Sequence, residues 1–369
     1  MKYYIIAGEA SGDLHASNLM KEIMSLDTKA KFRVWGGDRM KAEGAEVVKH
    51  YRDLAFMGFV EVAANIRTIT RNIRFCKEDI LEYQPDAIIL VDYPGFNLRI
   101  AEFAHKKAFK VFYYVSPQVW AWKKGRVKTI RRVVDKMMVI LPFEKDFYQQ
   151  YGYEVDFVGH PLLDAIADYS FLDRQDFIRQ NKLDGRPIIA LLPGSRRQEI
   201  SKMLKVMLKM VPIFRDYQFV IAAAPSVDQS FYDRITRDSD VKFLESQTYN
   251  LLNNAEAACV TSGTATLETA LMEIPEVVCY KGNPISYQIA RRIVDVKYIS
   301  LVNLIADKPL LTELIQNRLN VRNLKNELKT LLFDNEKRQY LKSEYKILKE
   351  KLGGEGASAN AARIITENI

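Results

Sequence analysis

The chain of 369 residues is 48% hydrophobic and 27% charged, and it carries a formal net charge of +8. This composition is typical of a globular protein and excludes a disordered or fibrous chain, and the length favours two domains that each bury a core. The positive charge indicates an anionic partner, whether a nucleic acid, a phosphorylated metabolite or a membrane surface.

No apolar run approaches the roughly 18 residues of a membrane span, and the N-terminal run is too short for a secretory signal. These features predict a cytoplasmic protein. Cys76, Cys259 and Cys279 form neither a disulfide framework nor a pattern of metal ligands. We therefore expect buried thiols and no metal site.

Apolar β-rich runs alternate with segments of helical periodicity. In chain order the predicted strands are residues 3–7, 86–92, 110–115, 136–141, 154–159, 187–194, 217–224, 241–245, 256–263 and 275–282. Because these runs are continuously apolar, they are typical of strands buried on both faces of a parallel sheet. The pattern predicts an α/β fold of doubly wound parallel sheets.

The series of strands restarts after a polar segment, residues 167–186, that forms strands poorly. We therefore expect an N-terminal Rossmann-like domain over residues 1–165 and a C-terminal one over residues 185–335. Residues 324–351 have helical periodicity, and residues 340–369 are expected to pack back on the first domain. Since ligands bind beyond the carboxyl ends of parallel strands, the cleft between the two sheets is the expected site.

The first predicted strand leads into an acidic glycine loop, GEASGD, at residues 8–13. It is not the GxGxxG of dinucleotide-binding proteins, because Glu9 and Asp13 stand where a pyrophosphate would lie. A nicotinamide cofactor is therefore not expected.

Two loops in the second half are candidate phosphate sites. In LLPGSRRQEI, Gly194 ends a strand, Ser195 is expected to cap the next helix, and Arg196 is expected in its first turn. An ordinary strand-to-helix connection with a surface arginine explains this loop equally well.

The second loop is TSGTATLE, in which the small residues Ser262, Gly263 and Thr264 allow a phosphate to approach the backbone. Glu268 lies one turn into the helix and could reach a ribose diol. A well-capped core helix with a solvated glutamate is the alternative.

Asp92 follows a buried strand directly, at the position where a general base is often found. The alternative is that it only caps the turn before Pro94. His160, which also follows a strand, is a second candidate near the cleft.

Aromatic and basic residues gather in two segments. Their members are Trp120, Trp122, Lys123, Lys124 and Arg126 in the one, and Phe56, Met57, Phe59, Arg67 and Arg71 in the other. Such patches suit a membrane interface, an amphipathic ligand or a single-stranded nucleic acid. Helices with one solvated basic face are the alternative.

The motifs AGEASGDLHA, FMGFVEV, LVDYPGFNLRIA, YYVSPQVWAWKKGR, LPFE, VGHPL, LLPGSRRQEI, TSGTATLE and GEGASANAA occur in this order over nearly the whole chain. The series resembles the lipid-A-disaccharide synthase family of Gram-negative bacteria. The resemblance implies an inverting glycosyltransferase of GT-B architecture that uses no metal or cofactor. Its implied substrates are UDP-2,3-diacylglucosamine and 2,3-diacylglucosamine 1-phosphate, which are joined to give a β-1,6-linked disaccharide and UDP.

The resemblance also implies roles for particular residues. Asp92 would be the base, and UDP would bind Gly194, Ser195, Arg196, Ser262, Gly263, Thr264, Glu268, Asn303, Glu313 and Gln316. Glu9, Ser11, Gly12, Asp13 and His160 would face the acceptor sugar. Phe56, Met57, Phe59, Trp120 and Trp122 would dock acyl chains, while Arg67, Arg71, Lys123, Lys124 and Arg126 meet anionic lipid on the cytoplasmic face of the inner membrane. Val302 stands where the family usually has proline.

Other interpretations remain open. A peptidoglycan-type N-acetylglucosaminyltransferase or a UDP-N-acetylglucosamine 2-epimerase would share the donor loops, but would not need the tryptophan and basic segment. A nucleic-acid-binding protein would explain the charge of +8 but would leave the loops without a ligand, so no nucleic acid partner is expected. The oligomeric state, a homodimer included, stays open.

Overall fold

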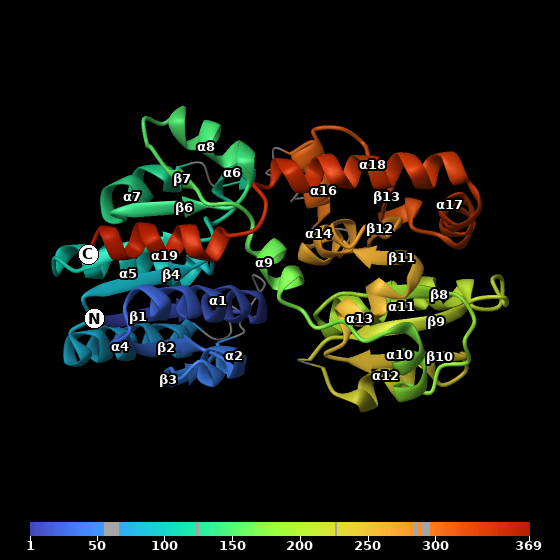
Figure 1. The fold of residues 1–369 in the computed structure, drawn as a ribbon, viewed down its shortest axis with the longest axis horizontal. Helices are drawn as coiled ribbons and strands as arrows, with labels where there is room; N and C mark the ends of the chain where they lie inside the picture. Colours follow the sequence, from blue (N-terminus) through green and yellow to red (C-terminus); the bar gives the residue numbers. More distant parts are fainter. Residues whose placement is uncertain (55–65, 123–124, 226, 284–286, 289–295) are drawn as a thin grey trace. The chain divides into compact units, whose positions relative to one another are not determined.

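The computed structural model describes residues 1–54, 66–122, 125–225, 227–283, 287–288 and 296–369. Phe56, Met57, Phe59, Lys123 and Lys124 therefore lie outside the described residues. The chain forms two compact units: Met1–Asp168 with Leu352–Ile369, and Tyr169–Lys351. Each unit is a parallel sheet covered by helices (Figure 1).

The first unit contains a seven-stranded parallel sheet with the order β3-β2-β1-β4-β5-β6-β7. Its strands are β1 (Lys2–Ala7), β2 (Lys31–Gly36), β3 (Glu46–His50), β4 (Ala87–Val91), β5 (Lys110–Tyr114), β6 (Lys136–Val139) and β7 (Asp156–Phe157). Ile5 of β1 lies beside Val34 of β2 and Ile89 of β4. Because the strand order reverses between β1 and β4, the loops that follow these two strands flank the switch point where such sheets bind ligands.

Helices pack on both faces of this sheet. Their bounds are α1 (Ala10–Leu26), α2 (Asp38–Ala42), η1 (Tyr51–Asp53), α4 (Ile66–Tyr83), α5 (Pro94–Lys106), α6 (Val119–Trp122), α7 (Arg126–Val133), α8 (Pro142–Gln149), α9 (Pro161–Ala167) and α19 (Ala357–Glu367). One hydrophobic cluster joins Tyr4, Ile88 and Tyr113 of the sheet to α4, α5 and α7. On the opposite face α1, α9 and α19 pack against one another.

The last helix, α19, completes the first unit although it follows the second unit in the chain. The carboxylate of Asp164 on α9 accepts hydrogen bonds from the amides of Gly356 (2.6 Å) and Ser358 (2.8 Å) at the start of α19. The buried face of α19 includes the small residues Ala357 and Ala361, which allow close packing on α1. Figure 1 shows this red helix among blue and cyan elements.

A buried polar network stabilises the α4 side of the sheet. The indole of Trp35 donates to the Tyr4 hydroxyl (2.7 Å), which in turn donates to Asp79 (2.6 Å). Asp79 also pairs with Arg33 at 2.6 Å. The network fixes α4 to β1 and β2, because each buried polar group has a partner.

The second unit contains a six-stranded parallel sheet with the order β10-β9-β8-β11-β12-β13. Its strands are β8 (Ile188–Leu192), β9 (Gln218–Ala223), β10 (Val241–Glu245), β11 (Ala255–Thr261), β12 (Glu276–Tyr280) and β13 (Glu313–Ile315). Its helices are α10 (Arg174–Gln180), α11 (Arg197–Met207), η2 (Leu208–Met210), α12 (Gln229–Thr236), α13 (Thr248–Asn253), α14 (Thr264–Leu271), α16 (Leu301–Ala306), η3 (Gln316–Arg318), α17 (Val321–Phe333) and α18 (Asn335–Lys351). The strand order again reverses beside its first strand, here between β8 and β11.

The predicted strands all lie in the two sheets, and the three buried cysteines are free thiols. The sequence prediction missed β2, β3 and β13, and it left α10 in a connecting segment. The chain returns to the first unit at Leu352 rather than at residue 340, because α18 is one continuous helix whose Leu341, Tyr345 and Leu348 are buried in the second unit.

Candidate functional site

Asp92 lies at the carboxyl end of β4 in an unusual backbone conformation. Both Asp92 and Tyr93 are left-handed, with φ angles of 44° and 47°. The Asp92 amide points at the end of β5, with the carbonyl oxygens of Tyr114 and Val115 at 3.3 and 3.2 Å. The turn projects Asp92 from the sheet edge at the switch point, as the sequence predicted.

The surroundings of Asp92 suit a general base. Burial, and after it the negative charge of Glu9, raises the pKa of Asp92 to about 7, although a backbone hydrogen bond at Tyr93 acts in the opposite direction. A base whose pKa lies near the working pH combines a useful ionised fraction with a strong driving force for proton transfer.

Gly8, which follows β1, allows the turn at Asp92 and Tyr93 to pack closely against the glycine loop. A Cβ atom at Gly8 would lie 2.4 Å from Cγ of Tyr93, so a larger residue would displace the tyrosine ring. The Tyr93 hydroxyl donates to the carbonyl oxygen of Leu54 (3.1 Å). The glycine loop thus shapes the turn that carries Asp92.

Asp13, the other acidic residue of the glycine loop, is hydrogen-bonded within the protein. Asp13 is buried, and its carboxylate accepts from the amides of Gly37 (2.7 Å), Arg39 (3.1 Å) and Met40 (3.3 Å) at the start of α2. These bonds account for an acidic residue at this position without a sugar ligand. Ser11 is exposed, and Gly12 is buried against β1.

His160 is the N-cap of α9, where its Nδ1 accepts from the Leu162 amide (3.2 Å). Its ring lies edge-on to His15 with centroids 6.5 Å apart. Burial, and then the neighbouring His15, lowers the pKa of His160 to about 3. His160 is therefore neutral at physiological pH and organises the chain near the sheet edge.

Sequence reasoning missed Glu144. The LPFE motif could have revealed it, because proline at the first position of a helix and glutamate two residues later are typical of a helix start. Glu144 is 1% exposed and accepts from the amides of Leu141 (3.0 Å) and Ile140 (3.3 Å) and from the indole of Trp120 (3.2 Å). Burial raises its pKa to about 7, against the lowering effect of these donors. Glu144 thus connects the segments that follow β5 and β6.

The same contacts bury Trp120, which is 8% exposed and also packs edge-on against Phe143. It offers little surface to an acyl chain, because its ring lies in the protein interior. The side chain of Trp122 lies outside the described residues. Arg67 and Arg71 are exposed on α4, and Arg126 is partly exposed at the start of α7.

In the second unit, Gly194 occupies the turn after β8 with φ of 109°. The positive φ favours glycine here, and a Cβ atom would also lie 3.0 Å from Oε2 of Glu199, so a larger residue would need that side chain to move. The sequence prediction placed the helix cap at Ser195, but α11 begins at Arg197 and Arg196 is its N-cap, because Arg196 is still extended. The Arg196 guanidinium lies 3.3 Å from Glu199.

The loop after β11 lies beside this turn, because β8 and β11 are paired. Gly263 is the N-cap of α14, and Thr264 is its first residue. Glu268 accepts a hydrogen bond from the Tyr249 hydroxyl (3.2 Å), and burial raises its pKa.

Hydrogen bonds connect Ser262 to the segment that contains Ile299, Asn303 and Glu313. Its hydroxyl donates to the Ile299 carbonyl (2.8 Å), and the carboxylate of Glu313 accepts from the Ile299 amide (3.1 Å) and from Nδ2 of Asn303 (3.0 Å). Gln316 follows β13 with φ of 53°, and its buried Nε2 has no hydrogen-bond partner among the described residues.

Val302 is buried in the first turn of α16. The first turn is where a helix tolerates proline, so the helix start suits both this valine and the proline that the resemblance leads us to expect.

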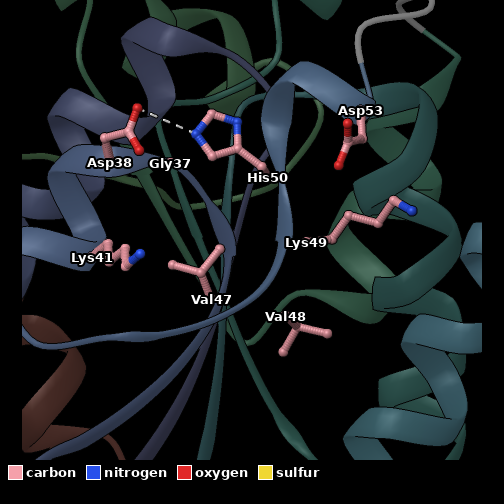
Figure 2. A pocket seen from close by; sticks show the side chains of 8 residues that line it. All are labelled: Gly37, Asp38, Lys41, Val47, Val48, Lys49, His50 and Asp53. Atoms are coloured by element: carbon pink, nitrogen blue, oxygen red, sulfur yellow. Dashed lines mark ion pairs between the residues drawn. The ribbon is translucent and has the colours of Figure 1, made fainter.

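A surface pocket of about 350 Å³ lies beside the start of α2. Figure 2 shows its lining residues, which are Gly37, Asp38, Lys41, Val47, Val48, Lys49, His50 and Asp53. The Asp38 carboxylate lies 3.5 Å from Nε2 of His50. Since the lining carries charges of both signs, it favours no single class of ligand.

Among the described residues, no group of three or more His, Cys, Asp or Glu side chains is arranged to hold a metal ion. Within the same part of the chain, no helix has both the length and the apolar character that crossing a membrane requires.

Two Rossmann-like units with loops at the switch points define the GT-B fold, which glycosyltransferases share with some epimerases. The chain is similar in structure to the UDP-GlcNAc 2-epimerase of Methanocaldococcus jannaschii solved with UDP-GlcNAc and UDP (TM-score 0.67, 13% identity, all of both chains covered). It is also similar to CalG4, the calicheamicin glycosyltransferase (TM-score 0.60, 14% identity, 100% of this chain and 98% of the other).

Sequence comparison identifies the family within this fold. Residues 3–367 match the lipid-A-disaccharide synthetase family. The lipid-A-disaccharide synthase of Syntrophus aciditrophicus is 40% identical over 97% of this chain and 95% of its own length, and that of Geobacter sulfurreducens is 39% identical over 99% and 96%. The chain therefore belongs to the lipid-A-disaccharide synthetase family.

Proposed function

We propose that the protein is a lipid-A-disaccharide synthase. It transfers the sugar of UDP-2,3-diacylglucosamine to the 6-hydroxyl of 2,3-diacylglucosamine 1-phosphate, and the products are the β-1,6-linked disaccharide 1-phosphate and UDP. The observation that carries this proposal is the family match over residues 3–367. The raised pKa of Asp92 at the switch point supports the part of general base that the proposal gives it.

In the proposed reaction Asp92 removes the proton of the acceptor 6-hydroxyl. The hydroxyl oxygen forms a bond to the anomeric carbon on one face of the sugar, while the bond to the β-phosphate oxygen breaks on the other face. The electron pair leaves with UDP, and the configuration inverts. The proton on Asp92 is then released to solvent.

UDP is proposed to bind at the loops that follow β8 and β11. The backbone at Gly194 and Ser195, with the Arg196 guanidinium, receives the pyrophosphate, together with Ser262, Gly263 and Thr264 at the start of α14. Glu268 binds the ribose. Arg196 and these amides stabilise the departing negative charge, so the proposed mechanism is independent of metal. Asn303 and Glu313 hold the adjacent segment in place, and Nε2 of Gln316, which has no hydrogen-bond partner among the described residues, is a donor for UDP.

The acceptor is proposed to lie against the glycine loop, near Glu9 and Ser11. Its acyl chains are proposed to contact the segment around Phe56, Met57 and Phe59. The exposed Arg67 and Arg71 meet anionic lipid at the cytoplasmic face of the membrane. This peripheral association predicts salt-sensitive binding to phosphatidylglycerol vesicles, and binding that is absent or independent of salt would contradict it.

The function is tested by incubating the protein with both diacylated sugars and following the tetraacyl disaccharide 1-phosphate by mass spectrometry. We expect product and UDP in equal amounts from the native protein and a loss of about three orders of magnitude for Asp92→Ala. Absence of product from the native protein would reject the function. Full activity of Asp92→Ala would reject only the role of Asp92. Thermal stabilisation by an oligonucleotide but not by UDP would favour a nucleic-acid-binding protein instead.

A further inference from the structure

The backbone of Asp92 is held by two buried side chains that neither the motifs nor the family resemblance assigns to the site. The Tyr113 hydroxyl on β5 donates to the Asp92 carbonyl oxygen at 2.5 Å, and Nδ2 of Asn97 on α5 donates to the same oxygen at 2.8 Å. Both residues are fully buried. The carbonyl oxygen of Asp92 therefore accepts two hydrogen bonds, both from buried side chains.

This arrangement matters because the turn is conformationally unfavourable. Asp92 and Tyr93 are successive residues with positive φ, a conformation that residues other than glycine rarely adopt. Such a backbone persists only when its surroundings determine it. The two donors fix the peptide plane between Asp92 and Tyr93, and this plane sets the direction in which the Asp92 side chain leaves the backbone.

We propose that Tyr113 and Asn97 are positioning residues that hold Asp92 in the orientation required of the general base. The inference rests on the proposed function, in which Asp92 removes the acceptor proton. Tyr113 reaches the turn from the neighbouring strand, since Val91 and Tyr114 are paired at the ends of β4 and β5. Asn97 reaches it from the first turn of the helix that follows, and its amide also approaches the Val91 carbonyl at 3.3 Å and the Ile6 carbonyl at 3.4 Å.

The hydroxyl of Tyr113 is suited to a permanent donor role. Burial, and after it the charge of Asp92, raises the pKa of this phenol well above its ordinary value, so it stays protonated over the whole working range of pH. The geometry gives its proton to the carbonyl oxygen of Asp92 and not to the carboxylate. Tyr113 acts on the base through the backbone and does not touch the substrate.

The neighbouring residue on the same strand provides a matched control. Tyr114 is equally buried but lies on the opposite face of the sheet, and its hydroxyl makes no hydrogen bond to Asp92. Tyr113→Phe and Tyr114→Phe remove the same atom from the same strand. The Tyr113 substitution alone removes a hydrogen bond to Asp92.

The test measures kcat and KM for both diacylated sugars in these two variants and in the native protein. We expect Tyr113→Phe to lower kcat roughly 10- to 100-fold with little change in KM, because a misplaced base slows the chemical step without weakening binding. Tyr114→Phe should keep kcat within about twofold. A Tyr113→Phe enzyme with native kcat, or two variants with equal losses, would overturn the proposal.

A second measurement separates positioning from general damage. In an Asp92→Ala background, the residual rate should not fall further when Tyr113→Phe is added, because both changes remove the same contribution. An additional loss equal to that in the native background would overturn the proposal. Asn97→Ala in the same design provides an independent second variant. If the native protein forms no disaccharide, the proposed function itself fails, and this outcome is distinct from an active enzyme that is indifferent to Tyr113.

Discussion

Glu9 and Asp92 interact at the carboxyl ends of the paired strands β1 and β4, where the charge of Glu9 adds to burial in raising the pKa of Asp92 to about 7. The two carboxylates are therefore not equivalent. Glu9 is the N-cap of α1, whereas Asp92 is the group whose pKa is raised. An acidic residue in the glycine loop thus has a role that a phosphate-binding loop would not need.

The first prediction concerns the pH dependence of catalysis. Asp92 acts as a base only when it is ionised, so kcat/KM should rise with pH through about 7 and level off above it. Initial rates between pH 5 and pH 9 in buffers of constant ionic strength would measure this limb. A rate that is flat across neutrality would argue against Asp92 as the titrating base.

The second prediction separates the effect of Glu9 from that of burial. Glu9→Gln removes the negative charge, so ionisation of Asp92 becomes easier and the acid limb of kcat/KM should move to lower pH. Ser11→Ala, at an exposed position in the first turn of α1, is the control and should leave the limb in place. An unchanged limb in Glu9→Gln would show that burial alone sets the pKa.

The third prediction is a cost in stability. The pKa of Asp92 is raised in the folded protein, so the folded state binds more protons between about pH 4 and pH 7 and loses stability as pH rises through this window. Asp92→Asn should therefore be more stable than the native protein at pH 8, by on the order of 1–3 kcal/mol, and similar near pH 4. Urea unfolding at both pH values measures the difference, and a less stable variant at pH 8 would contradict the expected sign.

The fourth prediction uses a buried carboxyl group in the second unit. Neither oxygen of Glu276 has a hydrogen-bond partner within the described residues, and burial raises its pKa well above the ordinary value. The sign is the same as for Asp92: stability falls as pH rises above the unfolded pKa, because the folded state retains a proton. Glu276→Gln should flatten this dependence in urea unfolding. Glu350→Gln, at an exposed position of α18, should not.

The fifth prediction compares the two carboxylates that pair with Arg33. The side chain of Asp79 is 3% exposed and that of Glu46 is 63% exposed. Asp79→Ala should cost about 3 kcal/mol, because it leaves the buried Tyr4 hydroxyl without its acceptor and removes the buried partner of Arg33. Glu46→Ala should cost less than about 1 kcal/mol. Equal losses of unfolding free energy in the two variants would show that burial does not decide the strength of these pairs.

The sequence predicted the strands buried on both faces because a central parallel strand leaves a continuous apolar run. It missed β2 and β3, where charged residues such as Arg33 and Lys49 interrupt the run, and β13, which has only three residues. These strands lie toward or at the edges of their sheets, where one side of the strand does not need to be buried.

The candidate site was predictable where a residue follows a buried strand, as Asp92 does. It was not predictable where a contact depends on side chains from distant elements. Glu144 and Trp120 meet only in the folded unit, so a tryptophan expected on the surface proves to be buried. Likewise, Asp13 accepts hydrogen bonds from backbone amides at the start of α2. The local sequence around Asp13 does not show that α2 lies beside it.

The position of α19 has a consequence for the order in which the chain folds during synthesis. The second unit is contiguous, so all of its residues are synthesised before Leu352 is added. The first unit begins the chain but lacks α19, the partner of α1 and α9, until the final residues emerge. The unit that carries Asp92 is therefore begun first, yet it reaches its complete fold only after every residue of the second unit has been synthesised.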